Sequence, residues 1–600
     1  MSTADAARRD WQERIYQESG QVAPVDSVTL AAPGGVVAAP GAGHVTLTWD
    51  PVPGAIGYHV FRDGVSVKQP DVDVPAVPDC RYVDTGQGAA SYTVAAIAAM
   101  HVTGPHSSPV TAAPLTASVR PSAAIAVNAG EVVRDLPRPW QYMIGSEHLS
   151  HMLCEDTSGG RPIGEELTTA LRTMRAEFGV ETVRAHAILC DDLGVYKEVD
   201  GRPVYDFSRI DEVYDTIMSF GLRPIVELGY MPRDLAGDPT KTVFAYNAII
   251  SPPKDFEAWA DLVHALVEHL ADRYGIQELI DNWAFEVWNE ANLAVFWSGT
   301  PSEYFLLYDV TAAAVKNVHP RLRVGGPSSA ANGWVEELLA HVAESGAALD
   351  FVSTHTYGNA PLDWRPALAR HGREGTPIWW TEWGPTPTHF HGIGDGPFGA
   401  TYLLHGMKSS AGRIEALSHW VASDHFEELG RPPRLFHGGF GLLTVGNLRK
   451  PRYHALTLAQ RLGPAELATS TTGDAAAVET WAARHPDGRI GVLVWNGTLN
   501  QSQADGAPEL ARTVTLKVSG LSGRYAVTHH RIDEDHSNIR SVWQSMGDSD
   551  WPTDDQWPKL QAANTLDELH PPTTAEPSNG ELVLTFDLPM PAVSFIELTP

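Results

Sequence analysis

Between residues 137 and 465, short apolar runs alternate with segments in which hydrophobic and polar positions follow a helical period. One of these segments, after the Pro252-Pro253 pair, has apolar residues three or four positions apart on a single face. Those residues are Phe256, Trp259, Val263, Leu266, Val267 and Leu270. This spacing predicts an amphipathic helix that packs against a core.

The apolar runs between the helical segments are rich in β-branched and aromatic residues, as is typical of strands buried on both faces of a parallel sheet. The predicted strands are 142–145, 182–187, 224–228, 283–289, 323–326, 351–355, 378–382 and 417–421. Eight strands with helices between most of them predict a (β/α)8 barrel.

The regions on either side of the barrel have a different pattern, with short alternating strands broken by Pro and Gly. In residues 24–116, Val45, Leu47 and Trp49 point one way and Tyr92 and Val94 form a later run, which resembles a fibronectin type III sandwich. The C-terminal strands predict a second sandwich. The expected division is a polar tail or brace at 1–23, the fibronectin type III-like sandwich at 24–116, a strand at 124–136 that joins the C-terminal sandwich, the barrel at 137–465 and the C-terminal sandwich at 466–600.

Length and charge narrow the classes of function. A chain of 600 residues is too long for one core. Its 43 basic and 73 acidic residues give a net charge of −30, which repels phosphate backbones and anionic lipids. We therefore expect neither nucleic acid nor a membrane as a partner. A homo-oligomer remains an open alternative.

Targeting and metal-binding signals are weak. The start of the sequence lacks the apolar stretch of a signal peptide, and no run reaches membrane-spanning length, so a cytoplasmic location is expected. The sequence has only three cysteines, Cys80, Cys154 and Cys190, and no CxxC motif. This pattern indicates neither a disulfide framework nor a zinc site. His389 and His391 lack a nearby third ligand and are interpreted as part of a mobile loop at the edge of a pocket. We expect no metal and no cofactor.

Two predicted strands end in glutamates, Glu290 after Trp283–Asn289 and Glu382 within Pro377–Trp383. The carboxyl ends of barrel strands meet on one face, so these side chains are expected to face a common pocket. Cleavage of a glycosidic bond needs such a pair, with one carboxyl group protonated and the other ionised. The alternative is that each glutamate merely bonds to a neighbouring arginine or to the backbone.

The motifs around these glutamates resemble glycoside hydrolase family 39, which includes bacterial β-xylosidases and, more distantly, α-L-iduronidase. The matching stretches are 184–192, 223–232, 251–255, 285–290, 324–327, 351–357, 420–428, 436–442 and 541–547. The resemblance covers roughly residues 124–600 and leaves out the fibronectin-like region. It implies a barrel glycosidase that retains anomeric configuration, with Glu290 as acid/base, Glu382 as nucleophile and Asn289 bonded to the sugar 2-hydroxyl.

Further residues are expected around the sugar, and each has a packing role as its alternative. They are His186 and His355 as hydroxyl contacts, Tyr357 as a partner of the nucleophile, Trp420 as the floor, Glu427 as a hydroxyl acceptor, Tyr230 and Phe296 as apolar wall, and Glu147 at the pocket lining. Glu227 is expected to influence the protonation of the glutamate pair from behind.

The sequence departs from the family pattern on the leaving-group side. Ala291 replaces the common proline after the acid/base, and the run after Glu382 contains Pro385 and Pro387. The expected activity is removal of a pentose, most simply β-D-xylosyl, from the non-reducing end of short oligosaccharides. Arabinofuranosyl or disaccharide release, endo-hydrolysis and an inactive sugar-binding scaffold remain alternatives. A uronate substrate is not expected, because it needs basic donors and approaches against the negative field.

Overall fold

The computed structural model describes residues 3–22, 28–67 and 76–600. Eight parallel strands form the central sheet in the order β11-β14-β17-β20-β21-β22-β23-β24, which confirms the predicted barrel. They are β11 (Met143–His148), β14 (Thr182–His186), β17 (Arg223–Leu228), β20 (Ala284–Val287), β21 (Val324–Ser329), β22 (Phe351–Tyr357), β23 (Ile378–Gly384) and β24 (Ala416–His419). The Ala422 amide donates to the Gly145 carbonyl at 2.9 Å and so ties the segment after β24 to β11.

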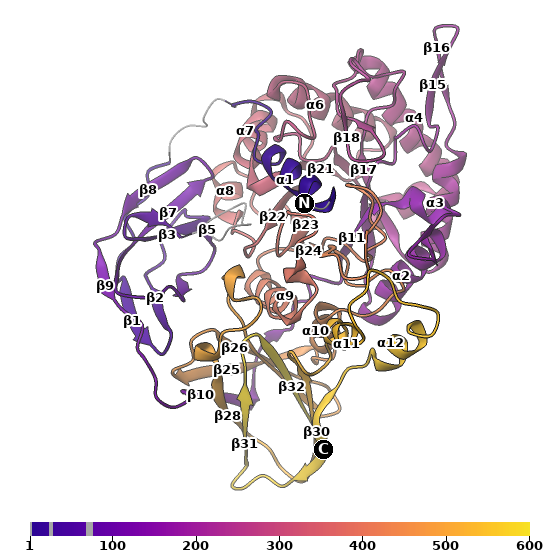
Figure 1. The fold of residues 1–600 in the computed structure, drawn as a ribbon. Helices are drawn as coiled ribbons and strands as arrows, with labels where there is room; N and C mark the ends of the chain where they lie inside the picture. Colours follow the sequence, from indigo (N-terminus) through magenta and orange to yellow (C-terminus); the bar gives the residue numbers. More distant parts are fainter. Residues whose placement is uncertain (1–2, 23–27, 68–75) are drawn as a thin grey trace.

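Helices surround the barrel (Figure 1). They are α2 (Ile163–Phe178), α3 (Ser208–Ser219), α4 (Phe256–Tyr274), α5 (Ile276–Asn282), α6 (Pro301–Val318), α7 (Val335–Ser345), α8 (Arg365–Arg370), α9 (Pro397–Ser410) and α10 (Pro451–Gln460). The predicted face of α4 is buried from Trp259 to Leu270, and Asp255 caps its first turn by accepting from the Glu257 and Ala258 amides. Among the described helices, none is long and apolar enough to cross a bilayer.

The barrel interior is apolar at the amino ends of its strands. Six side chains from near the strand starts pack there: Met143, Ile225, Ala284, Phe351, Trp379 and Ala416. Further along the strands, buried charged groups replace them, including Arg184, Glu227 and Glu286. A filled floor below and charged groups above leave the carboxyl face as the place for a site.

The C-terminal β region has nine strands in one continuous hydrogen-bonded order, β30-β29-β32-β27-β26-β25-β10-β28-β31. They are β10 (Ser122–Asp135), β25 (Ala465–Gly473), β26 (Val478–Arg484), β27 (Ile490–Asn496), β28 (Arg512–Ser519), β29 (Tyr525–Ile532), β30 (Glu568–Ala575), β31 (Glu581–Leu588) and β32 (Ala592–Thr599). Strand β10 precedes the barrel in sequence but pairs with β25 and β28. Two short helices, α11 (Ile539–Ser545) and α12 (Trp557–Ala563), lie in this part of the chain.

The N-terminal β region has two sheets, β1-β2-β6 and β4-β3-β7-β8, with β5 on β3 and β9 on β7. Their strands are β1 (Val37–Gly41), β2 (His44–Thr48), β3 (Gly57–Arg62), β4 (Val65–Ser66), β5 (Ala76–Val77), β6 (Arg81–Asp84), β7 (Ala90–Ala99), β8 (Val102–His106) and β9 (Val110–Ala112). The predicted inward residues Val45, Leu47, Trp49, Tyr92 and Val94 share one core. The predicted start of this region at residue 24 lies outside the described residues.

The first helix, α1 (Thr3–Arg14), lies over the barrel face (Figure 1). The sequence predicts a tail or a brace here, yet Trp11 is only 3% exposed. Its indole packs against Phe244 and Phe296, which come from loops of the barrel. The polar appearance of the segment hides one deeply buried aromatic residue.

Candidate active site

Glu290 and Glu382 meet at the carboxyl end of the barrel. Glu290 follows β20, Glu382 lies within β23, and the two residues are 7% and 4% exposed. One carboxylate oxygen of each lies within 4.8 Å of the other and of a His355 ring nitrogen. Carboxyl groups that act as a nucleophile and an acid/base pair lie about 5–5.5 Å apart in retaining glycosidases, and this spacing is compatible with that range.

Both oxygens of Glu382 accept strong hydrogen bonds. Arg184 Nη1 donates to Oε1 at 2.5 Å, and Tyr357 Oη donates to Oε2 at 2.7 Å. Burial and the Glu382 charge raise the pKa of Tyr357 well above its usual value, so the phenol keeps its proton to donate. A negative charge on Glu382 is therefore stabilised from two directions.

Arg184 is a buried cation that sequence reasoning did not single out. Its guanidinium pairs with Glu227 at 2.7 Å, Glu286 at 2.8 Å and Glu382 at 2.5 Å. Burial opposes its charge, but Glu227 and Glu286 outweigh burial and raise the pKa of Arg184 further. Glu227 and Glu286 are neighbours in the β17–β20 register, and like charges in that position repel unless a cation lies between them. The signal for this network was an arginine between Val183 and Ala185, inside a predicted strand.

Arg184 also orients the residue before the acid/base. Its Nη2 donates to Asn289 Oδ1 at 2.7 Å, and Asn289 Nδ2 donates to Tyr230 Oη at 3.2 Å. Tyr230, predicted as an apolar wall, is fully buried and holds the Asn289 amide in place. The side-chain amide of Asn289, which faces the cavity, is thus held at both its oxygen and its nitrogen.

His355 bonds to Glu290 on one side and to Thr381 on the other. Its Nδ1 lies 2.7 Å from Glu290 Oε1, and its Nε2 lies 3.0 Å from Thr381 Oγ1. Burial, with the nearby Arg184 charge, holds the pKa of His355 well below its usual value, so the ring is neutral. A neutral imidazole can donate or accept at Nδ1, so it suits Glu290 in either protonation state. His355 is fully buried behind Glu290 and does not line the cavity.

His186 and Glu428 form a second charged pair at the cavity. His186 Nδ1 lies 2.7 Å from Glu227 Oε2, and its Nε2 lies 3.6 Å from Glu428 Oε1. Burial opposes a charge on His186, but Glu227 outweighs it and raises the pKa to about 10. Burial likewise opposes a charge on Glu428, but hydrogen bonds from His186 and His389 lower its pKa. Both groups are therefore charged at neutral pH.

A cavity of about 370 Å³ opens above these groups. Of the predicted site residues, it is lined by His186, Asn289, Glu290, Phe296, Tyr357, Glu382 and Trp420. His389, from the loop predicted at the pocket edge, also lines it, together with residues that were not predicted, including Trp11, Ile15, Leu293, Glu428 and Phe440. This volume is at the lower end of the usual range for small-molecule sites, roughly 300–1,000 Å³.

Glu427 and Glu147 lie outside the cavity wall. Glu427 is half-buried and accepts from Arg431 Nε at 3.2 Å, because the loop turns its side chain outward and the next residue, Glu428, inward. Glu147 is buried behind this loop and accepts the Glu427 amide at 2.5 Å. Burial and then Glu428 raise the pKa of Glu147 well above its usual value.

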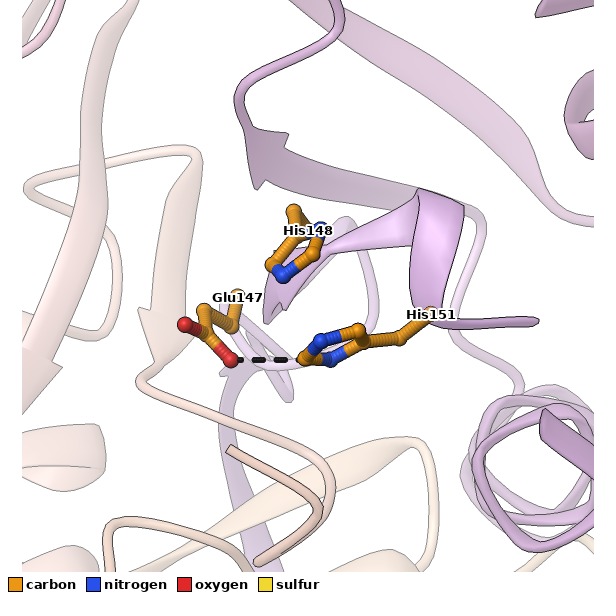
Figure 2. Close-up of side chains that lie close together, drawn as sticks. All are labelled: Glu147, His148 and His151. Atoms are coloured by element: carbon orange, nitrogen blue, oxygen red, sulfur yellow. Dashed lines mark ion pairs between the residues drawn. The ribbon is translucent and has the colours of Figure 1, made fainter. Parts of the chain in front are cut away.

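Glu147, His148 and His151 lie close together at the end of β11 (Figure 2). His151 Nδ1 is 3.7 Å from Glu147 Oε2, but the two imidazole centroids are only 3.6 Å apart. Two histidines that share a metal at about 2.0–2.1 Å point away from it, which separates their centroids by roughly 5 Å. The ring arrangement therefore fits packing rather than coordination of one ion.

These histidines predict loss of stability in acid. Burial and then His186 lower the pKa of His148 to about 3, and burial with His148 holds that of His151 well below 6.5. The unfolded chain binds these protons first, so stability is highest above about pH 6.5 and falls toward pH 3, by up to about 1.4 kcal/mol per pH unit for each ring. Urea unfolding between pH 7 and pH 4 should show a steeper decline for the parent protein than for His148→Asn/His151→Phe.

The half-exposed His319, changed to Asn, is the control for this measurement. Its pH profile should follow that of the parent. Equal slopes for the parent and the double variant would contradict the assignment of neutral, buried rings at His148 and His151.

Most of the chain is similar to known proteins. The family model for glycosyl hydrolases family 39 matches residues 123–578. A β-xylosidase of Geobacillus stearothermophilus is 32% identical over 495 residues, which cover 76% of this chain and 92% of that protein. A β-xylosidase of Caldicellulosiruptor saccharolyticus is 31% identical over 500 residues, or 79% and 98% of the two chains. The crystal structure of a monomeric β-xylosidase from Caulobacter crescentus CB15 superposes with a TM-score of 0.69 at 32% identity and covers 80% of this chain and 99% of that one.

Proposed function

The chain belongs to family 39 of the glycosyl hydrolases, and from this premise we propose that it is an exo-acting β-xylosidase that releases single β-D-xylosyl residues from short glycosides. The observation that carries the proposal is the approach of Glu290 and Glu382 to within 4.8 Å at the wall of a small cavity. The named β-xylosidases at 31% and 32% identity support the choice of sugar. An arabinofuranosyl substrate is the nearest alternative, since it could use the same two carboxyl groups.

In the first step, Glu382 attacks the anomeric carbon while Glu290 gives its proton to the leaving oxygen. A bond forms between Glu382 and the sugar carbon as the glycosidic bond breaks, and the leaving group departs as a neutral alcohol. In the second step, Glu290 takes a proton from water, which attacks the same carbon and releases Glu382. Two displacements restore the starting configuration, so the product is β-xylose.

The neighbouring groups support these roles. Arg184 and Tyr357 stabilise the charge that Glu382 carries before attack and regains at the end. His355 keeps a hydrogen bond to Glu290 while that residue gains and loses its proton. Asn289, fixed by Arg184 and Tyr230, faces the sugar 2-hydroxyl, where a hydrogen bond strengthens as positive charge develops on the ring.

The remaining residues hold the sugar. Trp420 supplies an apolar floor, and Glu428 with the charged His186 accepts and donates to the hydroxyls. We assign the acceptor role to Glu428 in place of Glu427, because only Glu428 lines the cavity. Glu147 acts as a positioning residue through the Glu427 amide, and Phe296 contributes to the wall away from the sugar.

We also propose that the chain divides functionally as its strand pairing suggests. Residues 24–116 form a fibronectin type III-like sandwich, and 137–465 form the catalytic barrel. Residues 124–136 complete the C-terminal sandwich of 466–600, which the pairing of β10 with β25 and β28 supports.

A panel of 4-nitrophenyl glycosides tests the proposal. We expect kcat/KM for the β-D-xyloside to exceed those for the α-L-arabinofuranoside and β-D-glucoside by about 10-fold or more, because each unmatched hydroxyl or methylene group costs transition-state binding. Proton NMR of the first product should show the β-anomer before mutarotation. A preference for the arabinofuranoside would move the assignment to the alternative, and an initial α-anomer would contradict the retaining mechanism.

A further inference from the structure

We propose that residues 11–19, called the arm below, build the leaving-group side of the cavity and make it select glycosides whose aglycone is aliphatic or aromatic instead of a second sugar. This inference rests on the proposed β-xylosidase function and specifies its substrate class.

The arm is fastened to the loop that follows Glu290. The Ser19 amide donates to the Asn292 carbonyl at 3.0 Å, and the Ala294 amide donates to the Gln17 carbonyl at 2.8 Å. Ser19 Oγ donates to the Ala291 carbonyl at 2.6 Å. These bonds lay the arm alongside the loop as an added antiparallel segment, with Glu18 opposite Leu293.

The other end of the arm is fastened to the loop that follows Glu382. Trp11 Nε1 donates to the Pro387 carbonyl at 3.3 Å, and Gln12 Nε2 donates to Thr388 Oγ1 at 3.4 Å. The arm therefore spans from one catalytic loop to the other. A leaving group that departs past Glu290 must pass between these two loops, and so it meets the arm.

The buried side chains that the arm presents there, Trp11 and Ile15, are apolar, and the exposed Tyr16 and Glu18 lie at the outer edge of the cavity. Trp11 contacts His389 edge-on at 4.9 Å and Phe296 at 5.8 Å. Ile15, Leu293 and Met100 line the cavity near it. This end adjoins the sugar-binding end, where Glu290, Glu382, Glu428 and His186 converge, because His389 Nε2 also lies 2.8 Å from Glu428 Oε2.

Polar groups are few in the buried part of this wall, because Tyr16 and Glu18 lie at its exposed edge. Asn292 lines the cavity, but its Nδ2 donates to the Ala330 carbonyl at 3.0 Å and its Oδ1 accepts the Ala330 amide at 2.9 Å. A sugar moved from water into such a place loses hydrogen bonds that it does not regain. An aliphatic or aromatic aglycone gains from the same burial, at roughly 0.8 kcal/mol per methylene group.

The arm and Met100 also lie before residue 123, where the family match begins. Part of the wall is thus contributed by residues outside the matched region, and Leu293, Phe296 and His389 complete it from within that region. Its chemistry has to be judged from the residues themselves, and the buried side chains of the arm, Trp11 and Ile15, are apolar.

Alkyl β-D-xylosides of increasing length test the inference. Binding of methyl, butyl and hexyl β-D-xyloside and of xylobiose is measured by titration calorimetry in the inactive Glu382→Gln background, with and without Trp11→Ala. We expect hexyl β-D-xyloside to bind about 10-fold or more tightly than either the methyl glycoside or xylobiose. Trp11→Ala should remove most of that gain and leave the methyl glycoside within about 2-fold.

Three further variants distinguish the loss of apolar contacts with the ligand from a disturbance of the protein fold. Trp11→Phe should keep most of the chain-length gain, and Ile15→Ser, at a second point of the wall, should reduce it. Arg9→Ala, on the exposed side of α1 and outside the arm, should leave it unchanged. Tighter binding of xylobiose than of hexyl β-D-xyloside, or equal weakening of all four ligands by Trp11→Ala, would overturn the inference.

Binding and turnover also distinguish the two proposals. If the chain-length gain is present but the parent protein hydrolyses no xyloside, the proposed function fails and the apolar wall stands. If xylosides are hydrolysed with no dependence of binding on chain length, the wall fails and the proposed function stands.

Discussion

Replacing Glu382 with Ala should lower kcat on 4-nitrophenyl β-D-xyloside by roughly four orders of magnitude or more, because no covalent intermediate can form. Even this activated substrate needs the nucleophile, since a good leaving group does not supply the attacking oxygen. Added azide fits the space vacated by the carboxylate and should attack from the same face. The product would be α-xylosyl azide, with configuration opposite to that of the substrate, identified by NMR.

The matched control for this experiment is Glu268→Ala, which removes an exposed carboxylate on α4. Its kcat should equal that of the parent protein. Circular dichroism melting of both variants checks that the fold is kept. Turnover by Glu382→Ala within about 10-fold of the parent would contradict the assigned nucleophile.

Replacing Glu290 with Ala should have an effect that depends on the leaving group. For a poor leaving group such as an alkyl alcohol, loss of the acid should lower kcat/KM by roughly 10²–10⁴. For 2,4-dinitrophenyl β-D-xyloside the departing phenolate needs no proton, so formation of the intermediate should be nearly unaffected. Its hydrolysis then becomes slow, and a rapid burst of dinitrophenol should precede a low steady rate.

Azide distinguishes this variant from the first. It should restore the steady rate of Glu290→Ala by attacking the covalent intermediate, and the product should be β-xylosyl azide with retained configuration. Equal losses on alkyl and dinitrophenyl substrates would show that Glu290 acts in some way other than as an acid, for example by holding His355 in place.

The barrel was predictable because its strands are buried on both faces and therefore appear as uninterrupted apolar runs. The run predicted at 351–355 is the start of β22, and that at 378–382 is most of β23. The segment predicted at 417–421 is shorter as a strand and begins one residue earlier, because the chain leaves the sheet after His419. The sequence left open whether residues 1–23 form a tail or a brace, since one tryptophan among polar residues gives no periodic signal.

The meeting of Glu290 and Glu382 at one cavity was predictable, because each residue lies at the end of such an apolar run. Which of Glu427 and Glu428 faces the cavity was not predictable, because a loop has no regular period to show which of two adjacent side chains points inward. Nor does sequence reveal that Trp288 and Glu290 adopt left-handed φ values of 67° and 46° on either side of Asn289. Such conformations cost free energy for residues with a Cβ, and the packed surroundings have to impose them.

The position of β10 has a consequence for synthesis of the chain. Its apolar side chains Ala123, Ile125 and Val127 end up fully buried between β25, which begins at Ala465, and β28, which begins at Arg512. A ribosome that adds about 5–20 residues per second makes these partners tens of seconds after β10 has emerged. During that interval the backbone groups on both edges of the nascent strand lack their hydrogen-bond partners, and its apolar face is exposed. Production of the protein in a cell should therefore depend on chaperones that shield this stretch until translation reaches the last quarter of the message.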